Sequence, residues 1–281
     1  MNEIQRNQIN SAEMTAYWRT SESIISNDSL SVNLVSQEGI NNAHTFVEKL
    51  NYHCVSRLIS VRARYFFDQA VQLLKTGKYD SCISLASGFS LLNDNILNTN
   101  EFNEIKFYDS DLAHVIQVRK NRMDTFINKS NIKFHKNNKT ITLDLNDLLF
   151  NNTFKEIFTN VKNPLIILEG ISYFISSDVL NILFKELSLF KHAAIILDYF
   201  PENSATRSEH FRKHAKNVTS FIPEIINTIK TDENNYLSLI KINNHISVQE
   251  YENQICKMHG LKTKLTDENI FFPTQFIVFA K

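Results

Sequence analysis

Residues 80–95 read DSCISLASGFSLLNDN, and this stretch decides the fold class of the chain. Residues 81–86 form a short apolar run that predicts a buried strand, Ser87-Gly88 predicts a turn, and residues 89–97 carry a helical pattern. A strand that ends in a small-residue turn and enters a helix is a common way to hold a nucleotide. This turn holds one glycine, so the pattern by itself fits either a cofactor loop or a tight corner of an α/β protein.

The same alternation of apolar runs and helical patterns continues to the end of the chain. It predicts βαβ units, and therefore a mostly parallel α/β sheet with helices on both faces. Ser247 and Gly260 have the positions of an N-cap and a C-terminal stop for one of the later helices. The seven predicted strands are residues 81–86, 105–109, 140–145, 164–170, 193–200, 261–267 and 274–281, the last of them antiparallel, and the predicted helices between them include 111–127, 176–190 and 247–260.

The chain before residue 80 carries helical patterns and no strand signal, and its last helix ends at Gly77. We therefore expect a helical N-terminal cap over residues 1–78 and an α/β core over residues 79–281. Residues of about 203–230 also have a helical pattern and predict an insertion into the core. No linker separates these parts, so one compact unit is expected.

Composition excludes several classes of function. The 281 residues have a formal net charge of zero and no basic stripe, which argues against a nucleic-acid partner. No apolar run reaches the ~18 residues of a membrane span, and the N-terminus lacks the apolar core of a signal peptide, so a cytoplasmic protein is expected. Cys54, Cys82 and Cys256 match no metal or disulfide spacing, and His210 and His214 lack the glutamate of a zinc-protease pair, so no metal is predicted.

Acidic residues recur where the predicted strands end. In an open parallel sheet, ligands bind beyond the carboxyl ends of the strands. A single acid there is also explained as a helix cap or as a favourable charge at a helix N-terminus. A carboxylate after the second strand is the usual partner of ribose hydroxyls, because it can accept two hydrogen bonds from a vicinal diol. The strand-end acids are Asp109, Asp111, Asp144, Glu169 and Asp198.

Five segments, taken in order, resemble the leucine carboxyl methyltransferase family. They are TAYWRTSES (15–23), ISVRARYFFDQAVQLLKTGKYDSCISLASGF (59–89), KFYDSDLAHVIQVRKNRM (106–123), TLDLND (142–147) and LIILEGISYFI (165–175). The resemblance implies the class I S-adenosylmethionine (SAM) methyltransferase fold. That fold is a Rossmann-like α/β structure with a mostly parallel seven-stranded sheet, here with the helical cap.

The resemblance also implies the roles of site residues toward SAM, the only cofactor predicted. Arg19 and Arg62 would bind the methionine carboxylate, which a planar guanidinium can pair with bidentately. Glu169 would face the ammonium group. The loop Ala86, Ser87 and Gly88 would pass the methionyl and ribose parts, Asp111 would bind the ribose diol with Asp109 as second choice, and Asp144 and Leu145 would meet the adenine.

Aromatic residues near the predicted strand ends are the candidates for the reacting end of the pocket. Tyr173 and Tyr199 are the candidate catalytic side chains. Together with Trp18, Phe174 and Phe200 they fit either a sulfonium-binding wall, through cation–π contact, or the hydrophobic core.

The chain also departs from the family pattern, which commonly reads Leu-Gly-Ala-Gly-Leu-Asp-Thr-Arg at the first loop. Here Ala86 replaces the first glycine, the Asp-Thr-Arg is absent, and Phe174 takes a tyrosine position. Three functions therefore stay open. The first is methyl transfer to a carboxylate or hydroxyl of a small specialised metabolite, the second is cyclisation of SAM to azetidine-2-carboxylate and methylthioadenosine, and the third is SAM binding without catalysis. The sequence predicts no oligomeric state.

Overall fold

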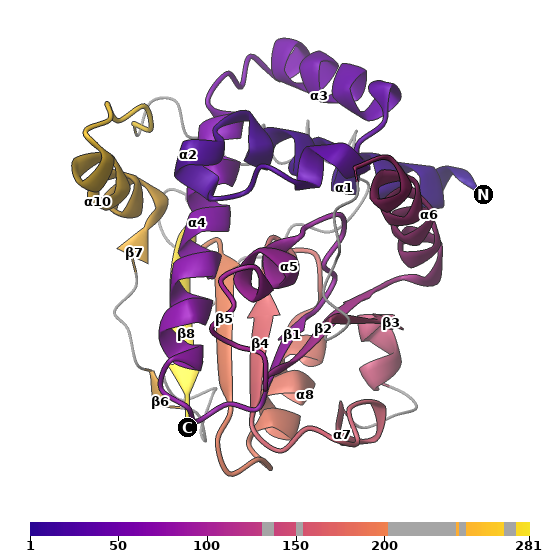
Figure 1. Cartoon of the computed structure of the whole chain (residues 1–281), viewed down its shortest axis with the longest axis vertical. Helices are drawn as coiled ribbons and strands as arrows, with labels where there is room; N and C mark the ends of the chain where they lie inside the picture. Colours follow the sequence, from indigo (N-terminus) through magenta and orange to yellow (C-terminus); the bar gives the residue numbers. More distant parts are fainter. Residues whose placement is uncertain (131–137, 150–153, 202–239, 242–245, 267–273) are drawn as a thin grey trace.

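The chain is built around one central sheet with helices packed on both of its faces (Figure 1). The computed structural model describes residues 1–130, 138–149, 154–201, 240–241, 246–266 and 274–281. The strands are β1 (Ser81–Ser84), β2 (Lys106–Asp111), β3 (Asn138–Thr142), β4 (Pro164–Leu168), β5 (Ala194–Tyr199), β6 (Ile240–Lys241), β7 (Ile246–Ser247) and β8 (Gln275–Ala280). The α-helices are α1 (Glu3–Ser21), α2 (Ser23–Ser26), α3 (Gln37–Leu50), α4 (Val55–Leu74), α5 (Leu92–Leu97), α6 (Ala113–Ser130), α7 (Phe154–Ile157), α8 (Ser177–Leu187) and α10 (Val248–His259), and the 3₁₀ turns are η1 (Ser31–Leu34) and η2 (Leu145–Leu149).

The strands lie in the order β3-β2-β1-β4-β5-β8, with the short β6 and β7 both paired to β8. Strands β1 to β5 are parallel to their neighbours, and β8 is antiparallel to β5. Because β6 and β7 share one position beside β8, the sheet is seven strands wide and mostly parallel, as predicted. The strand order reverses between β1 and β4, and this is the point where open α/β sheets bind ligands.

Both faces of the central strands β1, β4 and β5 are buried, which explains the continuous apolar runs in the sequence. Alternate residues point to opposite faces. On one face, Cys82 and Leu165 belong to the hydrophobic cluster that includes α4, α5 and α10. On the other, Ile83 and Ile166 pack in the cluster with α7 and α8. Helices on both faces were predicted, and the structure confirms them.

One predicted strand is wrong over the residues that the structure describes. Residues 261–266 lie after α10 without strand pairing, and the final sheet position is taken by β6 and β7 instead. The backbone N–H groups of Lys264 and Leu265 donate to the carboxylate of Glu252, at 2.9 Å each. Glu252 is fully buried, so these backbone groups supply the hydrogen bonds that a buried carboxylate requires.

Other element boundaries shift by a few residues. Strand β2 continues through Asp111, and the third strand occupies Asn138–Thr142 rather than 140–145. The predicted helix at 89–97 begins only at Leu92, because the preceding residues remain in the loop after β1. Helix α10 has the predicted Ser247 N-cap and the Gly260 stop, whose φ is +64°. The predicted insertion at about 203–230 lies outside the described residues.

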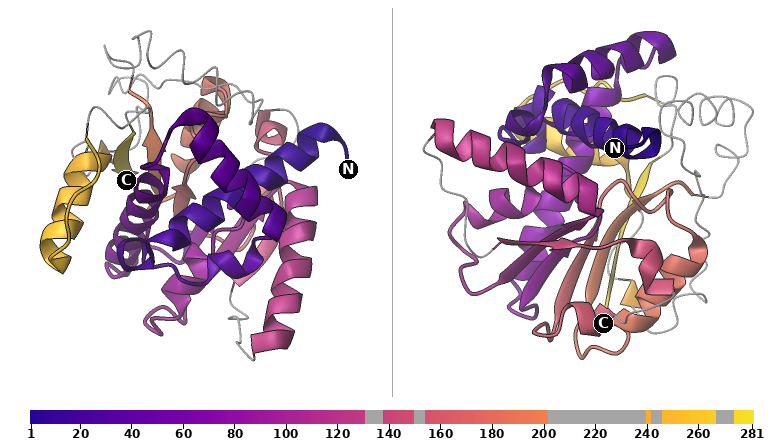
Figure 2. Two further views of the ribbon diagram at one scale, coloured as in Figure 1. Left: turned by 90° about the horizontal axis from the view of Figure 1, so that it is seen from above. Right: turned by 90° about the vertical axis from the view of Figure 1, so that its right-hand side faces the viewer.

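Of the helices before β1, α1 and α3 lie beyond one end of the sheet (Figures 1 and 2). Helix α4 instead lies on the face of the sheet, where the ring of Tyr65 stacks on Phe276 of β8 at 4.4 Å. The division of the chain near residue 78 stays a prediction. Among the residues that the structure describes, no helix combines the length and apolar character needed to cross a membrane.

Candidate functional site

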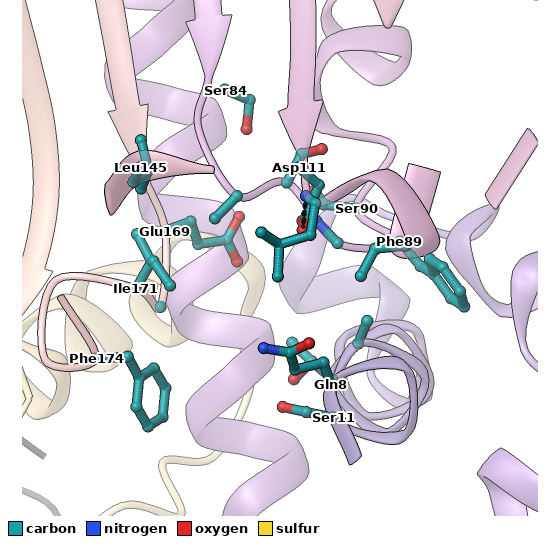
Figure 3. A pocket seen from close by; sticks show the side chains of 18 of the residues that line it. Gln8, Ser11, Ser84, Phe89, Ser90, Asp111, Leu145, Glu169, Ile171 and Phe174 are labelled. Atoms are coloured by element: carbon teal, nitrogen blue, oxygen red, sulfur yellow. Dashed lines mark hydrogen bonds between the residues drawn. The ribbon is translucent and has the colours of Figure 1, made fainter. Parts of the chain in front are cut away.

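A cavity of about 330 Å³ lies beyond the carboxyl ends of β1, β2 and β4, and α1 covers it from the other side. This volume is within the range of small-molecule sites. Figure 3 shows Gln8 and Ser11 of α1 facing Asp111 and Glu169 across it. The cavity brings together most of the predicted cofactor-binding residues: Arg19, Arg62, Ala86, Ser87, Gly88, Asp111, Asp144, Leu145 and Glu169.

The loop after β1 takes its shape from two left-handed residues. Ala86 has φ +51° and Gly88 has φ +53°. The backbone N–H of Ser87 between them donates to the carbonyl of Ser110, at 2.9 Å. A left-handed alanine costs about 1 kcal/mol relative to a relaxed one. Ala86 therefore keeps a backbone conformation that suits glycine, although the sequence departs from the family's glycine there.

Asp111 is the last residue of β2 and is the acid of this strand that reaches the cavity. Its Oδ2 accepts a hydrogen bond from the Gly88 N–H at 2.7 Å, and its Oδ1 accepts one from the Leu112 N–H at 2.7 Å. These two bonds fix the orientation of the carboxylate, whose oxygens are acceptors of the kind that ribose hydroxyls require.

Asp109 does not line the cavity, although it is only two residues away. Its carboxylate is buried and accepts hydrogen bonds from Arg119 at 2.6 Å, Asn93 at 2.8 Å and Asn138 at 2.8 Å. These three donors come from α6, α5 and β3. The structure thus brings the first-choice acid of the sequence analysis to the cavity and places the second choice in a separate buried network.

A charged cluster forms another part of the cavity wall. Glu169, directly after β4, lies 3.4 Å from Arg19 and 3.5 Å from Arg62. Arg19 and Arg62 thus supply this partly buried carboxylate with two cationic partners. Arg19 also pairs with Asp28 at 2.9 Å, and Arg62 lies 3.7 Å from Asp198 at the end of β5.

The arrangement around Arg62 depends on close packing. The guanidinium lies against Gly170, where an added Cβ would come within 2.8 Å of Arg62 Nη1, and Gly170 has φ +71°. Burial raises the pKa of Asp198 to about 6, an effect that the positive charge of Arg62 partly offsets. For Arg62, burial favours the neutral form, but Tyr173, Asp198 and Glu169 outweigh it and raise the pKa. Arg62 is therefore charged, and Asp198 is mostly ionised at neutral pH.

The predicted catalytic tyrosines do not line the cavity. The Tyr173 hydroxyl accepts a hydrogen bond from Arg62 at 2.9 Å, and its ring stacks on Phe200 at 4.3 Å. The Tyr199 hydroxyl donates to Gln275 at 2.9 Å. A catalytic role for either stays a prediction. Of the five aromatic candidates, Phe174 lines the cavity, and Trp18 is buried against Phe46.

The remaining wall follows β3 and is mostly apolar. Leu143 and Leu145 lie beside Leu112, and Asp144 between them accepts hydrogen bonds from the backbone and side chain of Asn146, at 2.9 and 3.0 Å. An apolar lining with a few polar groups suits an aromatic base.

Helix α1 supplies residues that the sequence analysis did not single out, apart from Arg19. They recur every three or four positions, so they share one face of the helix. Helical periodicity of 3.6 residues, counted back from Arg19, could have identified these residues from the sequence. From Gln8 to Arg19 the face spans about 16 Å at 1.5 Å per residue. Its residues are Gln8, Ser11, Ala12, Thr15, Ala16 and Arg19.

The described residues contain no group of three or more His, Cys, Asp or Glu side chains that could hold a metal ion. His210 and His214 lie outside these residues. Cys54, Cys82 and Cys256 are free thiols, with Cys82 and Cys256 buried.

No family model and no curated protein matches the sequence. Among solved structures, a protein from Thermobifida fusca YX, provisionally classed as a methyltransferase, is 10% identical with a TM-score of 0.62 over 96% of this chain and 94% of its own. The magnesium protoporphyrin IX methyltransferase of Synechocystis PCC 6803, solved with bound S-adenosylhomocysteine, is 12% identical with a TM-score of 0.43, over 87% of this chain and 95% of its own. The strand order and the first of these likenesses agree: the chain has the class I methyltransferase fold.

Proposed function

We propose that the cavity binds SAM and that the protein transfers its methyl group to a small-molecule acceptor. The observation that carries the proposal is the combination of groups in one cavity. Asp111 suits a ribose diol, the leucines near β3 suit a base, and the cluster at Glu169 suits a charged amino-acid group. These three regions of the cavity correspond to the ribose, the adenine and the methionyl group of SAM.

The charge of the cluster favours a cationic ligand. Two guanidinium groups, Arg19 and Arg62, face three carboxylates, Asp28, Glu169 and Asp198, so the cluster carries one excess negative charge when all are ionised. The methionyl end of SAM is a zwitterion with an additional positive sulfonium. In a buried site this attraction is screened less than it would be in water.

The expected roles follow from position. Arg19 and Arg62 are placed to bind the methionine carboxylate, and Glu169 to bind the ammonium group. Attack on a sulfonium methyl is an in-line displacement, so the protein must mainly position the two reactants and exclude water. A general base is needed only where the acceptor must lose a proton. We propose a carboxylate or a hydroxyl as the acceptor group, in line with the resemblance to leucine carboxyl methyltransferases.

Cyclisation of SAM is the second candidate, and two observations favour methyl transfer over it. A cyclase needs a neutral amine as its nucleophile, and a carboxylate such as Glu169 at the methionyl end stabilises the charged ammonium. The altered loop was the sequence feature that suggested an unusual seat for the methionyl arm. Since Ala86 keeps the left-handed conformation that suits glycine, the loop supports binding of the methionyl arm as in a methyltransferase.

Calorimetry with S-adenosylhomocysteine tests the binding proposal, and ATP serves as a control because the loop has no phosphate seat. We expect S-adenosylhomocysteine to bind with micromolar affinity and ATP not to bind. Incubation with SAM alone, followed by mass spectrometry, separates the chemistries. Steady formation of methylthioadenosine with matching azetidine-2-carboxylate would establish the cyclase. Binding without turnover, on SAM alone or with a panel of carboxylate and hydroxyl acceptors, would favour a non-catalytic SAM-binding protein.

A further inference from the structure

Arg119 on α6 touches the cavity loop from behind without lining the cavity. Its guanidinium is buried, and Nη1 donates to the Oγ of Ser87 at 2.9 Å and to the carbonyl of Gly88 at 3.2 Å. Its Nη2 donates to Asp109 at 2.6 Å. One side chain thus joins the loop after β1 to the buried acid in β2.

Gly88 is held from two directions, through the two peptide groups that meet at its Cα. Its N–H donates to Asp111, and its carbonyl accepts from Arg119. The same N–H orients the Asp111 carboxylate in the cavity. Loss of the Arg119 contacts to the Gly88 carbonyl and the Ser87 Oγ would free the φ and ψ angles of Gly88, on which glycine imposes few limits, and Asp111 would then lose one of the donors that fix its orientation.

The position of Arg119 is in turn fixed by Asp109. The other oxygen of Asp109 accepts from Asn93, and Asn138 donates both to Asp109 and to the buried Asp94. Burial, with the nearby charge of Asp109, raises the pKa of Asp94 to about 7. The acid that pairs with Arg119 is Asp109, at 2.6 Å.

We propose that Arg119, held by Asp109, is a positioning residue that sets the shape of the Ser87–Gly88 loop and, through Gly88, the orientation of Asp111. This inference rests on the proposed function, because the loop and Asp111 are taken to bind the ligand. It assigns Asp109 a role through Arg119 in place of direct contact with ribose.

The test compares Arg119→Lys and Arg119→Met with Asp94→Asn as the matched control. Calorimetry measures the Kd for S-adenosylhomocysteine at pH 6, and urea unfolding measures stability. Arg119→Met should weaken binding at least about tenfold, the effect of losing charge-assisted hydrogen bonds. Lysine should rescue part of this, because it keeps the charge without the fork. Asp94→Asn imitates the protonated acid and should bind like wild type.

A double-mutant cycle separates positioning from a general loss of stability. If Arg119 acts through the loop, Ser87→Ala should cost clearly less affinity in the Arg119→Lys background than alone. Additive effects, or equal binding by Arg119→Met and wild type, would overturn the proposal while leaving SAM binding intact.

Hydrogen exchange of the Gly88 amide in the ligand-free protein tests whether Arg119 holds the Gly88 N–H against Asp111, without any ligand. Exchange should be faster in Arg119→Lys than in Asp94→Asn and wild type. Equal exchange in all three overturns the proposal. Absence of ligand binding by the wild-type protein would count against the proposed function and leave this exchange result as the measure of the contact.

Discussion

Replacing Arg62 with lysine tests the charged cluster most directly. The Arg62 guanidinium reaches Tyr173 at 2.9 Å, Glu169 at 3.5 Å and Asp198 at 3.7 Å, and it lies against Gly170. A lysine ammonium at the same place is a point charge on a narrower chain. Unlike the planar guanidinium, it cannot contact Tyr173, Glu169 and Asp198 at the same time, and it cannot pair bidentately with a carboxylate.

The expected magnitude follows from the contacts that lysine loses. A hydrogen bond to a charged group contributes about 1.5–3 kcal/mol. Arg62→Lys keeps the charge but loses, on balance, one such hydrogen bond, so the free energy of unfolding should fall by about 2 kcal/mol. Loss of the bidentate pair with the ligand carboxylate should weaken S-adenosylhomocysteine binding by about 10- to 100-fold, since 1.4 kcal/mol corresponds to tenfold.

Arg64→Lys is the matched control on the same helix. Arg64 pairs with Asp68 one turn along, at 2.8 Å, and does not line the cavity. Such i,i+4 pairs contribute about 0.5 kcal/mol or less. Urea unfolding and calorimetry on both variants give the comparison. Similar losses of affinity in Arg62→Lys and Arg64→Lys would refute the assignment of Arg62 to the ligand carboxylate.

Three further predictions concern the loop and the buried acids. Asp111→Ala should weaken S-adenosylhomocysteine binding by about 1–3 kcal/mol in calorimetry, and unchanged affinity would remove Asp111 from the ribose role. Ala86→Gly relieves a left-handed alanine and should change the free energy of unfolding by no more than about 1 kcal/mol, because glycine also loses more chain entropy on folding. Ligand affinity should stay within about twofold of wild type, a margin of roughly 0.4 kcal/mol, and a larger loss would show that the alanine methyl contacts the ligand. Burial raises the pKa of Asp94 to about 7 and of Asp198 to about 6, above their values in an unfolded chain. Folding therefore favours their protonated forms, so their contribution to stability is lost as pH rises from about 4 to about 7. Urea titrations across this window should show a smaller decline in Asp94→Asn, and an unchanged slope would contradict the raised pKa.

The sequence contained most of the information about the sheet. Strands β1, β4 and β5 lie in short apolar runs, and such a run is readable locally because both faces of these central strands are buried. The strand predicted at 261–267 is absent over its described residues, because Glu252 in the preceding helix α10 accepts hydrogen bonds from the backbone N–H groups of Lys264 and Leu265. No local pattern carries that contact.

For the site, the sequence by itself determined that acids stand at the strand ends, and the resemblance to a known family suggested which of them would face SAM. Only the tertiary structure decided between Asp109 and Asp111. Both lie at the end of β2, but α5, α6 and β3 supply the donors that engage Asp109, while the loop after β1 brings the Gly88 N–H to Asp111. The α1 face and the position of Arg119 were likewise set by packing between segments distant in the chain. Local propensity determines where a strand or helix forms, but which side chains meet at a site depends on how those elements pack, and that information is spread over the whole chain.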